Sequence, residues 1–310
     1  MRRPVCTAVQ RFRGRSRMHA TLISTHRDCL RQIYAQHLRW GSPYALVDFP
    51  DHANVGDSAI WLGELVILRA ITGRDPSYVS AWHDFDRDAF LHSCPDGPVL
   101  IHGGGNLGDL WSHHQRFRES LLTAFPDRTI VQLPQSIFFR DGGAADDFAD
   151  MASRHPDFTL YVRDRVSLRF AQSSLRLPAR LAPDSAMMLD LERQGAASEP
   201  LLALMRTDAE RAKRVPDLPA GAKMVDWLVD DDGLPAGRDA AAREGQALAR
   251  LNRGVVLLSQ AQHLITDRLH GHILALLMGL SHEIRDNSYG KLSAYASSWK
   301  TDPMLSPEAA

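Results

Sequence analysis

Cysteine and net charge are both scarce in this sequence. Among its 310 residues, Cys6, Cys29 and Cys94 are the only cysteines, and they form no CxxC pair. This spacing excludes a disulfide framework and a zinc ribbon, and it favours a reducing cytoplasm. The formal net charge is -1, so the chain lacks the basic field that draws proteins onto nucleic acid. An anionic ligand must therefore be held by local groups.

Long apolar runs are missing as well. The apolar stretch 273–280 contains Gly279, whereas a membrane-spanning helix needs roughly 20 apolar residues. Residues 1–18 carry six arginines with no apolar stretch behind them, so they are not a secretory signal. We expect a disordered basic tail at 1–18, with Met18 as an alternative start. A basic arm that contacts anionic lipid at the cytoplasmic face of a membrane is the alternative.

Short apolar runs alternate with amphipathic segments through most of the chain, which predicts an α/β fold with parallel sheets. A first, doubly wound lobe is expected at residues 19–195. Its strands are predicted at 44–49, 77–81, 98–102, 129–133, 159–162 and 181–189, and its helices at 58–71, 114–124, 145–154 and 165–173.

A second, smaller lobe is expected at residues 196–300, followed by a tail at 301–310. Its strands are predicted at 201–205, 263–266 and 281–285, and its helices at 240–252, 270–278 and 291–299. Residues 216–237 are rich in proline, glycine and aspartate and show little periodicity, so we expect an irregular loop there.

Ligands of parallel sheets bind beyond the carboxyl ends of the strands, where turns lead into helices. The turn at 51–58 offers Asn54 and Asp57 as hydrogen-bonding groups for sugar hydroxyls. A purely structural interpretation makes Asp57 or Ser58 a helix N-cap and Gly56 a turn residue.

A glycine-rich turn follows the strand predicted at 98–102. Gly103, Gly105 and Gly108 formally satisfy GxGxxG, and such glycines let the backbone approach a ligand. The next strand ends at 133–136 with Leu-Pro-Gln-Ser, which supplies no acid for a ribose. A nicotinamide cofactor is therefore disfavoured, and the absent Lys-Ser/Thr pair excludes a P-loop. We expect no cofactor.

The turn at 266–272, Thr-Asp-Arg-Leu-His-Gly-His, is the strongest anion site of the sequence. A helix N-terminus presents free N–H groups, Arg268 adds a cation, and His270 titrates near neutrality. In the alternative interpretation, Arg268 pairs with Asp267 or Asp184 and His270 caps the helix. Arg206 also ends a strand, but pairing with Asp208 is an alternative for it.

Two further patterns suggest metal binding only weakly. His113-His114 and His270-x-His272 lack an HExxH motif or a matching carboxylate, so we expect no dedicated metal site. Asp84-Phe85-Asp86 resembles the DxD of some glycosyltransferases, but it does not follow an apolar strand and is better explained as a helix cap.

Seven segments together resemble the polysaccharide pyruvyltransferase family. They occur in the expected order between residues 44 and 299, and no single one is specific. They are Asn54-x-Gly56-Asp57, His-Gly-Gly-Gly-Asn at 102–106, Leu-Pro-Gln-Ser at 133–136, Arg163-Asp164, Ala-Pro-Asp-Ser-Ala at 182–186, Thr-Asp-Arg-Leu-His-Gly at 266–271 and Asp-Asn-Ser-Tyr-Gly-Lys at 286–291.

The resemblance implies two Rossmann-like lobes arranged as in GT-B glycosyltransferases, with an interlobe cleft. It implies transfer of the pyruvyl group of phosphoenolpyruvate to two hydroxyls of one sugar, with release of phosphate, in the synthesis of exopolysaccharide or another cell-surface glycan. The acceptor is a sugar, free or lipid-linked. The implied donor-binding residues are Arg206, Arg268, Leu269, His270 and Gly271, and the acceptor-binding residues are Asn54, Asp57, Gly104, Gly105, Asn106 and Gln135.

This chemistry suits the residues, because guanidinium groups and a helix N-terminus fit a small dianion. We expect His270 to protonate the enol carbon and Asp57 or Asp109 to act as base toward the acceptor. A GT-B glycosyltransferase that uses a nucleotide sugar is the main alternative. The apolar helix at 273–278 speaks against it, because it lacks a ribose-binding glutamate. A glycan-binding scaffold is a non-enzymatic alternative.

Overall fold

Two parallel β-sheets organise the chain, as the sequence predicts. The computed structural model describes residues 6–208, 210–212 and 217–301. In the first sheet the strand order is β2-β1-β3-β5-β6-β7, with β4 also paired to β5, and every pairing is parallel. Its strands are β1 (Ala45–Val47), β2 (Tyr78–Ser80), β3 (Val99–Ile101), β4 (Gly104–Leu107), β5 (Ile130–Ile137), β6 (Phe158–Val162) and β7 (Ala179–Leu181).

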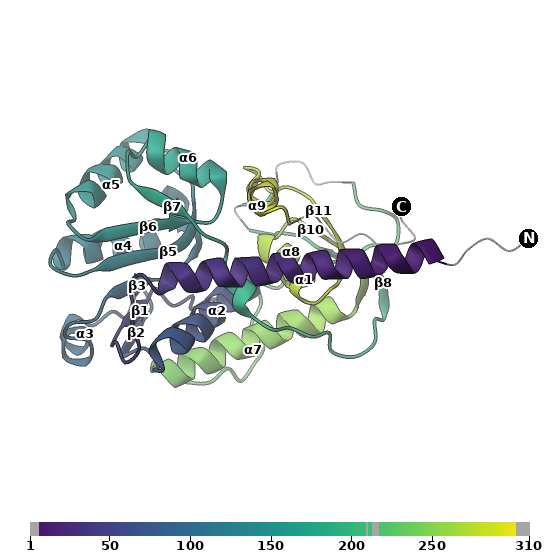
Figure 1. The fold of residues 1–310 in the computed structure, drawn as a ribbon, viewed down its shortest axis with the longest axis horizontal. Coiled ribbons are helices and arrows are strands. Elements are labelled where there is room, and N and C mark those ends of the chain that lie inside the picture. Colours follow the sequence, from purple (N-terminus) through teal and green to yellow (C-terminus); the bar gives the residue numbers. More distant parts are fainter. Residues whose placement is uncertain (1–5, 209, 213–216, 302–310) are drawn as a thin grey trace, which may run out of the picture.

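The helices between these strands cover the sheet and leave its inner strands buried on both faces, which suits all-parallel pairing (Figure 1). Leu46 of β1, for instance, lies opposite Leu100 of β3 and is fully buried. The helices are α2 (Val55–Thr72), α3 (Arg87–Ser93), α4 (Ser112–Ala124), α5 (Gly142–Arg154) and α6 (Arg165–Ser173), with the short 3₁₀ turns η1 (Asp109–Trp111) and η2 (Ser185–Met188).

The second sheet is smaller and has the order β11-β10-β8-β9, again with parallel pairings throughout. Its last helix turns back toward the first sheet. There the Trp299 indole donates to the Arg163 carbonyl (2.7 Å), and the Ser298 hydroxyl accepts from the Arg165 amide (2.9 Å). The elements are β8 (Glu199–Leu204), β9 (Lys223–Val225), α7 (Ala240–Ser259), β10 (Ala261–Thr266), α8 (Leu269–Leu277), β11 (Ser281–Ile284) and α9 (Lys291–Trp299).

Helix α2 connects the two sheets. Asn54 is its N-cap and accepts from the Gly56 amide, and Gly73 ends it in the left-handed conformation. The helix is apolar nearly all round, as expected of a buried helix. Its first residue, Val55, contacts α7 so closely that a Cβ on Gly254 would lie 2.3 Å from a Val55 methyl.

The N-terminal segment differs from the expected tail. Helix α1 (Cys6–Tyr34) begins at Cys6, so residues 6–18 are its first turns, while residues 1–5 lie outside the described part. Figure 1 shows this helix running along the molecule. Arg27 fastens it by donating to the carbonyls of Met187 (2.9 Å) and Leu189 (2.6 Å). The tail predicted at 301–310 falls almost wholly outside the described residues.

Three local predictions were wrong. The segment 181–189 is not one strand, because β7 ends at Leu181 and Asp184 caps the turn η2. The glycine-rich turn contains the short strand β4, which pairs with β5. Residues 217–237 are not wholly irregular, since β9 forms an edge of the second sheet and Trp227 is buried. Asp86 is the N-cap of α3, as predicted.

Candidate functional site

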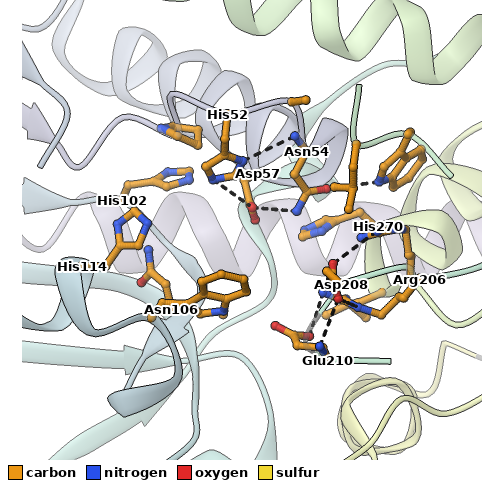
Figure 2. A pocket seen from close by; sticks show the side chains of 18 of the residues that line it. His52, Asn54, Asp57, His102, Asn106, His114, Arg206, Asp208, Glu210 and His270 are labelled. Atoms are coloured by element: carbon orange, nitrogen blue, oxygen red, sulfur yellow. Dashed lines mark hydrogen bonds and ion pairs between the residues drawn. The ribbon is translucent and has the colours of Figure 1, made fainter. Parts of the chain in front are cut away.

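A cavity of about 410 Å³ lies where the carboxyl ends of the two sheets meet (Figure 2). The turns that follow β1, β3, β8 and β10 supply most of its wall, as the rule for parallel sheets predicts. The polar groups lining it are Asp48, His52, Asn54, Asp57, His102, Asn106, His113, His114, Arg206, Asp208, Glu210, Arg268, His270 and Lys291.

Arg206 and Arg268 enter the cavity from the ends of β8 and β10. Arg268 bonds both oxygens of Asp226 (2.6 and 2.8 Å) and approaches Asp208 at 3.3 Å. Arg206 bonds Asp208 (2.8 and 2.9 Å), which is the pairing considered above. The pairs proposed from the sequence for Arg268 do not form. Asp208 is thus shared by two guanidinium groups that both line the cavity.

Lys291, the first residue of α9, is a third buried cation that the sequence reasoning did not assign. Its Nζ approaches Glu210 at 3.3 and 3.5 Å. Burial lowers the pKa of Lys291, although Glu210 opposes this. Burial alone would raise the pKa of Glu210, but Lys291 and Arg206 hold it at about 2. The signal in the sequence was the segment 286–291, whose lysine reaches a turn of the other sheet.

That reach ends at Gly105. A Cβ on Gly105 would lie 2.2 Å from Lys291 Nζ and 3.0 Å from an Arg163 guanidinium nitrogen. A side chain at position 105 would therefore displace the lysine head group, and the fully buried Arg163 beside it is held to Asp184 at 2.7 Å. The glycine-rich segment therefore packs directly against the head group of Lys291 from α9.

His270 lies in the first turn of α8 and does not cap it. Its Nε2 is 3.3 Å from Asp184 Oδ2, and its ring lies against the backbone of Gly56. Burial would raise the pKa of Asp184, but the His270 imidazole and the Arg163 guanidinium hold that pKa well below its usual range. Leu269 lines the cavity, whereas Gly271 is packed behind it, where a Cβ would meet Thr266 Oγ1 at 2.4 Å.

Asn54 and Asp57 line the cavity from the start of α2, beside His270 (Figure 2). Asn54, rather than Asp57 or Ser58, is the N-cap, and its amide donates to Asp57 Oδ2 (2.7 Å). Burial would raise the pKa of Asp57, but His52, His270 and His102 lower it to about 2. The cap predicted at Asp57 or Ser58 was therefore wrong, whereas Asn54 and Asp57 both line the cavity.

Of the other predicted residues, Gly105 and Asn106 line the cavity and Gln135 supports them. Gln135 accepts from the Asn106 amide (3.1 Å) and donates to its side-chain oxygen (2.8 Å). Gly104 adopts a positive φ of 129° beside Asp57. Asp109 is not brought to the cavity, because its carboxylate accepts from the amides of Arg140 and Asp141 at 2.8 to 2.9 Å.

Two histidine–carboxylate pairs in the wall were missed by the sequence reasoning. His114 Nδ1 is 2.7 Å from Asp48 Oδ1, and His102 Nδ1 is 2.7 Å from Glu64 Oε2. Both carboxylates are fully buried. Asp48 has a positive φ of 68°, which is uncommon for a non-glycine residue and marks functional sites in many proteins. The partners are 66 positions apart in the pair of His114 and 38 apart in the pair of His102, so no local sequence motif predicts either pair.

Across the part of the chain that the structure describes, no three His, Cys, Asp or Glu side chains are grouped so that they could hold a metal ion. In the same residues, no helix is both long and apolar enough to span a membrane.

The sequence comparisons match this chain to pyruvyl transferases. Residues 54–282 match the family model described as polysaccharide pyruvyl transferase. Pyruvyl transferase 1 of Schizosaccharomyces pombe is 31% identical, over 82% of this chain and 69% of that protein. Putative pyruvyl transferase EpsO of Bacillus subtilis is 28% identical, over 81% of this chain and 84% of that protein.

A solved structure shares the fold. The crystal structure of a functionally uncharacterised protein from Klebsiella pneumoniae superposes with a TM-score of 0.59 at 19% sequence identity. The match covers 89% of this chain and 96% of that one. At this level of identity the likeness concerns architecture alone.

Proposed function

Because the chain belongs to the polysaccharide pyruvyl transferase family, we propose that it is a ketal pyruvyltransferase with phosphoenolpyruvate as donor. It transfers the pyruvyl group to two hydroxyls of one sugar in an exopolysaccharide or other cell-surface glycan, and it releases phosphate. The observation that carries this proposal is one cavity whose second-sheet side, the cationic wall, carries Arg206, Arg268 and Lys291, and whose first-sheet side carries Asn54, Asp57 and Asn106.

The donor binds at the cationic wall. Phosphoenolpyruvate carries a carboxylate and a phosphate on a small frame, and guanidinium groups bind both in a bidentate manner. Arg206, Arg268, the Leu269 main chain and the turn at His270 and Gly271 hold it, and Lys291 adds a third cation. Since Asp208 now occupies both guanidinium groups, donor binding replaces this carboxylate with the donor's own anions.

The acceptor sugar binds on the first-sheet side, to Asn54, Asp57 and the segment of Gly104, Gly105 and Asn106 that Gln135 supports. The two sheets then correspond to the GT-B-like lobes, acceptor side first, with the cavity as their cleft. A lipid-linked sugar is one form of the acceptor, and in that case the enzyme works at the cytoplasmic face of a membrane. No cofactor takes part in this proposal.

His270 delivers a proton to the enol carbon of the donor, which becomes a methyl group and leaves a cation-like carbon beside it. Each of the two hydroxyl oxygens bonds to this carbon and loses its proton, and the bond to the phosphate oxygen breaks. Two protons leave the hydroxyls, one enters the methyl group and one goes to phosphate or water. Asp57 lines the cavity where the acceptor is proposed to bind, whereas Asp109 is not part of the cavity wall.

Incubation with phosphoenolpyruvate and sugar acceptors, followed by phosphate assay and mass spectrometry, tests the proposal. We expect phosphate release and a product heavier by a pyruvate ketal. Nucleoside diphosphate release from a sugar nucleotide, without transfer from phosphoenolpyruvate, would instead identify a glycosyltransferase.

The roles of two residues are tested by substitution. His270→Ala and Arg268→Ala should each lower kcat/KM at least tenfold, equivalent to about 1.4 kcal/mol of barrier. Arg154→Ala is the matched control, because Arg154 is largely exposed and lies on α5, away from the cavity. Transfer that survives both substitutions unchanged would contradict the assigned roles.

A further inference from the structure

The His102–Glu64 pair is buried in the wall on the acceptor side of the cavity. Glu64 has one oxygen on His102 Nδ1 (2.7 Å) and the other on the Gly103 amide (2.9 Å), so the carboxylate is fixed at both ends. His102 is 1% exposed and Glu64 is fully buried. A carboxylate on Nδ1 keeps the proton on that nitrogen and leaves the Nε2 lone pair facing away from Glu64.

That Nε2 atom is buried and has no hydrogen-bond partner within the described part of the chain. A buried polar atom left unpaired costs about 1–3 kcal/mol, and most proteins avoid the cost. His102 lines the cavity, and Figure 2 places it on the same side as Asp57 and His114. Because His102 is part of the cavity wall, a group that binds in the cavity can supply the missing partner.

Ketal formation requires a base, because both acceptor hydroxyls lose a proton. Asp57 is a weak base, since its pKa is held at about 2. For His102, burial would lower the pKa, but Glu64, Asp57 and Asp48 outweigh it and raise the pKa above its usual value.

We propose that His102, oriented by Glu64, is the base that takes the proton of an acceptor hydroxyl. The inference rests on the proposed pyruvyl transfer. As the hydroxyl oxygen bonds to the ketal carbon, its proton passes to Nε2, and the electron pair of the O–H bond forms the new C–O bond. The imidazolium then gives this proton from Nε2 to the departing phosphate or to water, while the other proton stays on Nδ1 in its hydrogen bond to Glu64.

The pH dependence of turnover follows from the groups that face His102. These are Glu64 and Asp57 of α2, Asp48 at the end of β1, and His52 of the following turn. A base works only when unprotonated, and its raised pKa in the free protein places the acidic limb of kcat/KM above pH 6.5, the ordinary histidine value. Among the groups that raise the pKa of His102, Glu64 has the strongest effect, so removing its charge should lower this pKa.

The test measures phosphate release from phosphoenolpyruvate with methyl glycosides of glucose, galactose and mannose as acceptor probes. His102→Gln should lower kcat about 100-fold or more while changing the Kd of phosphoenolpyruvate, measured by calorimetry, less than twofold. Glu64→Gln should shift the acidic limb of kcat/KM to lower pH, which a merely structural role would not do. His37→Gln is the matched control, because His37 lies near Tyr161, away from the cavity.

Each result decides between the proposals. No phosphate release by the unchanged chain contradicts the proposed function and, with it, this inference. Phosphate release by the unchanged chain, with His102→Gln equally fast or Glu64→Gln showing an unmoved acidic limb, contradicts the inference alone. Retained affinity for phosphoenolpyruvate shows that a slow variant is folded. If His102→Gln no longer binds phosphoenolpyruvate, the test rests on Glu64→Gln alone. An acidic limb that moves to lower pH in this variant supports the inference, and an unmoved limb contradicts it.

Discussion

At the scale of single residues, Gly56 of α2 and His270 of α8 are in contact although they are far apart in the sequence. A Cβ on Gly56 would lie 2.2 Å from His270 Nδ1, so Gly56→Ala forces the imidazole to move. We expect this variant to lower kcat at least tenfold, since His270 would leave its contact with Asp184. Phosphate release under saturating phosphoenolpyruvate measures the effect.

Gly142→Ala is the control for this substitution. A Cβ at Gly142 would meet nothing within 4 Å, and the residue lies in the first turn of α5. Its activity should equal that of the unchanged chain, with stability equal or about 0.4–1 kcal/mol higher. If Gly56→Ala behaves like Gly142→Ala, the position of His270 does not matter to turnover.

At the scale of elements, β9 and the residues after it complete the cavity. The buried Trp227 donates from Nε1 to Asn54 Oδ1 (3.1 Å) and lies 6.0 Å from the Arg268 guanidinium. Trp227→Phe removes the hydrogen bond but keeps an aromatic ring, so we expect a loss of about 1 kcal/mol in the free energy of unfolding. We expect kcat/KM to fall about tenfold, because Asn54 positions Asp57.

Urea unfolding and steady-state kinetics measure the two effects. Trp40→Phe is the matched control, because Trp40 is 79% exposed and should change stability by less than about 0.5 kcal/mol. An unchanged kcat/KM in Trp227→Phe would show that Asn54 keeps its place without the indole.

The packing of α1 on α9 predicts a sensitivity to acid. His26 is 2% exposed, stacks edge-on against Trp299, and has a pKa lowered by burial from 6.5 to about 4. Between these values the unfolded chain binds a proton at His26 and the folded chain does not, so protons favour unfolding. The free energy of unfolding should therefore fall by about 1.4 kcal/mol per pH unit from this residue as the pH drops from 6.5 toward 4.

His26→Phe keeps a ring against Trp299 and removes the titration. Urea unfolding at several pH values should show a shallower dependence for this variant than for the unchanged chain over that range. Equal slopes would contradict a buried neutral His26, whatever the absolute stability of the variant.

The elements differ in how well the sequence predicts them, for physical reasons. Regular amphipathic or apolar periods predicted both ends of α8 to within one residue and those of α2 to within three. Strand β9 was missed because its three residues are partly exposed at a sheet edge and leave no clear pattern. Arg268 and His270 follow directly from a strand-to-helix turn. Lys291 and the pairs of His102 and His114 depend on side chains that meet across the fold, which local spacing does not encode.

At the scale of the whole molecule, α7 ties the second sheet to the turn at the start of α2. Arg250 bonds Asp230 (2.9 to 3.1 Å) and donates to the Pro50 carbonyl (3.1 Å). Breaking a fully buried pair costs about 3–5 kcal/mol. Because Asp230 is partly exposed, we expect Arg250→Ala to lower the free energy of unfolding by somewhat less, about 2–3 kcal/mol.

Chemical denaturation followed by both fluorescence and circular dichroism tests this. The pair of Arg154 and Asp150 provides the comparison, since both side chains are more than three-quarters exposed and 3.8 Å apart. Arg154→Ala should change stability by less than about 0.5 kcal/mol. Similar losses for the two variants would mean that Arg250 contributes no more than a surface pair.

The lysine that abuts Gly105 comes from residue 291 of a 310-residue chain. During synthesis the first sheet can form as soon as its own strands have left the ribosome, since domains fold as their segments emerge. Its glycine-rich turn then stays without Lys291, which lies almost 190 residues further along the chain. A chain that ends before Lys291 therefore lacks one of the cations of the donor site proposed above.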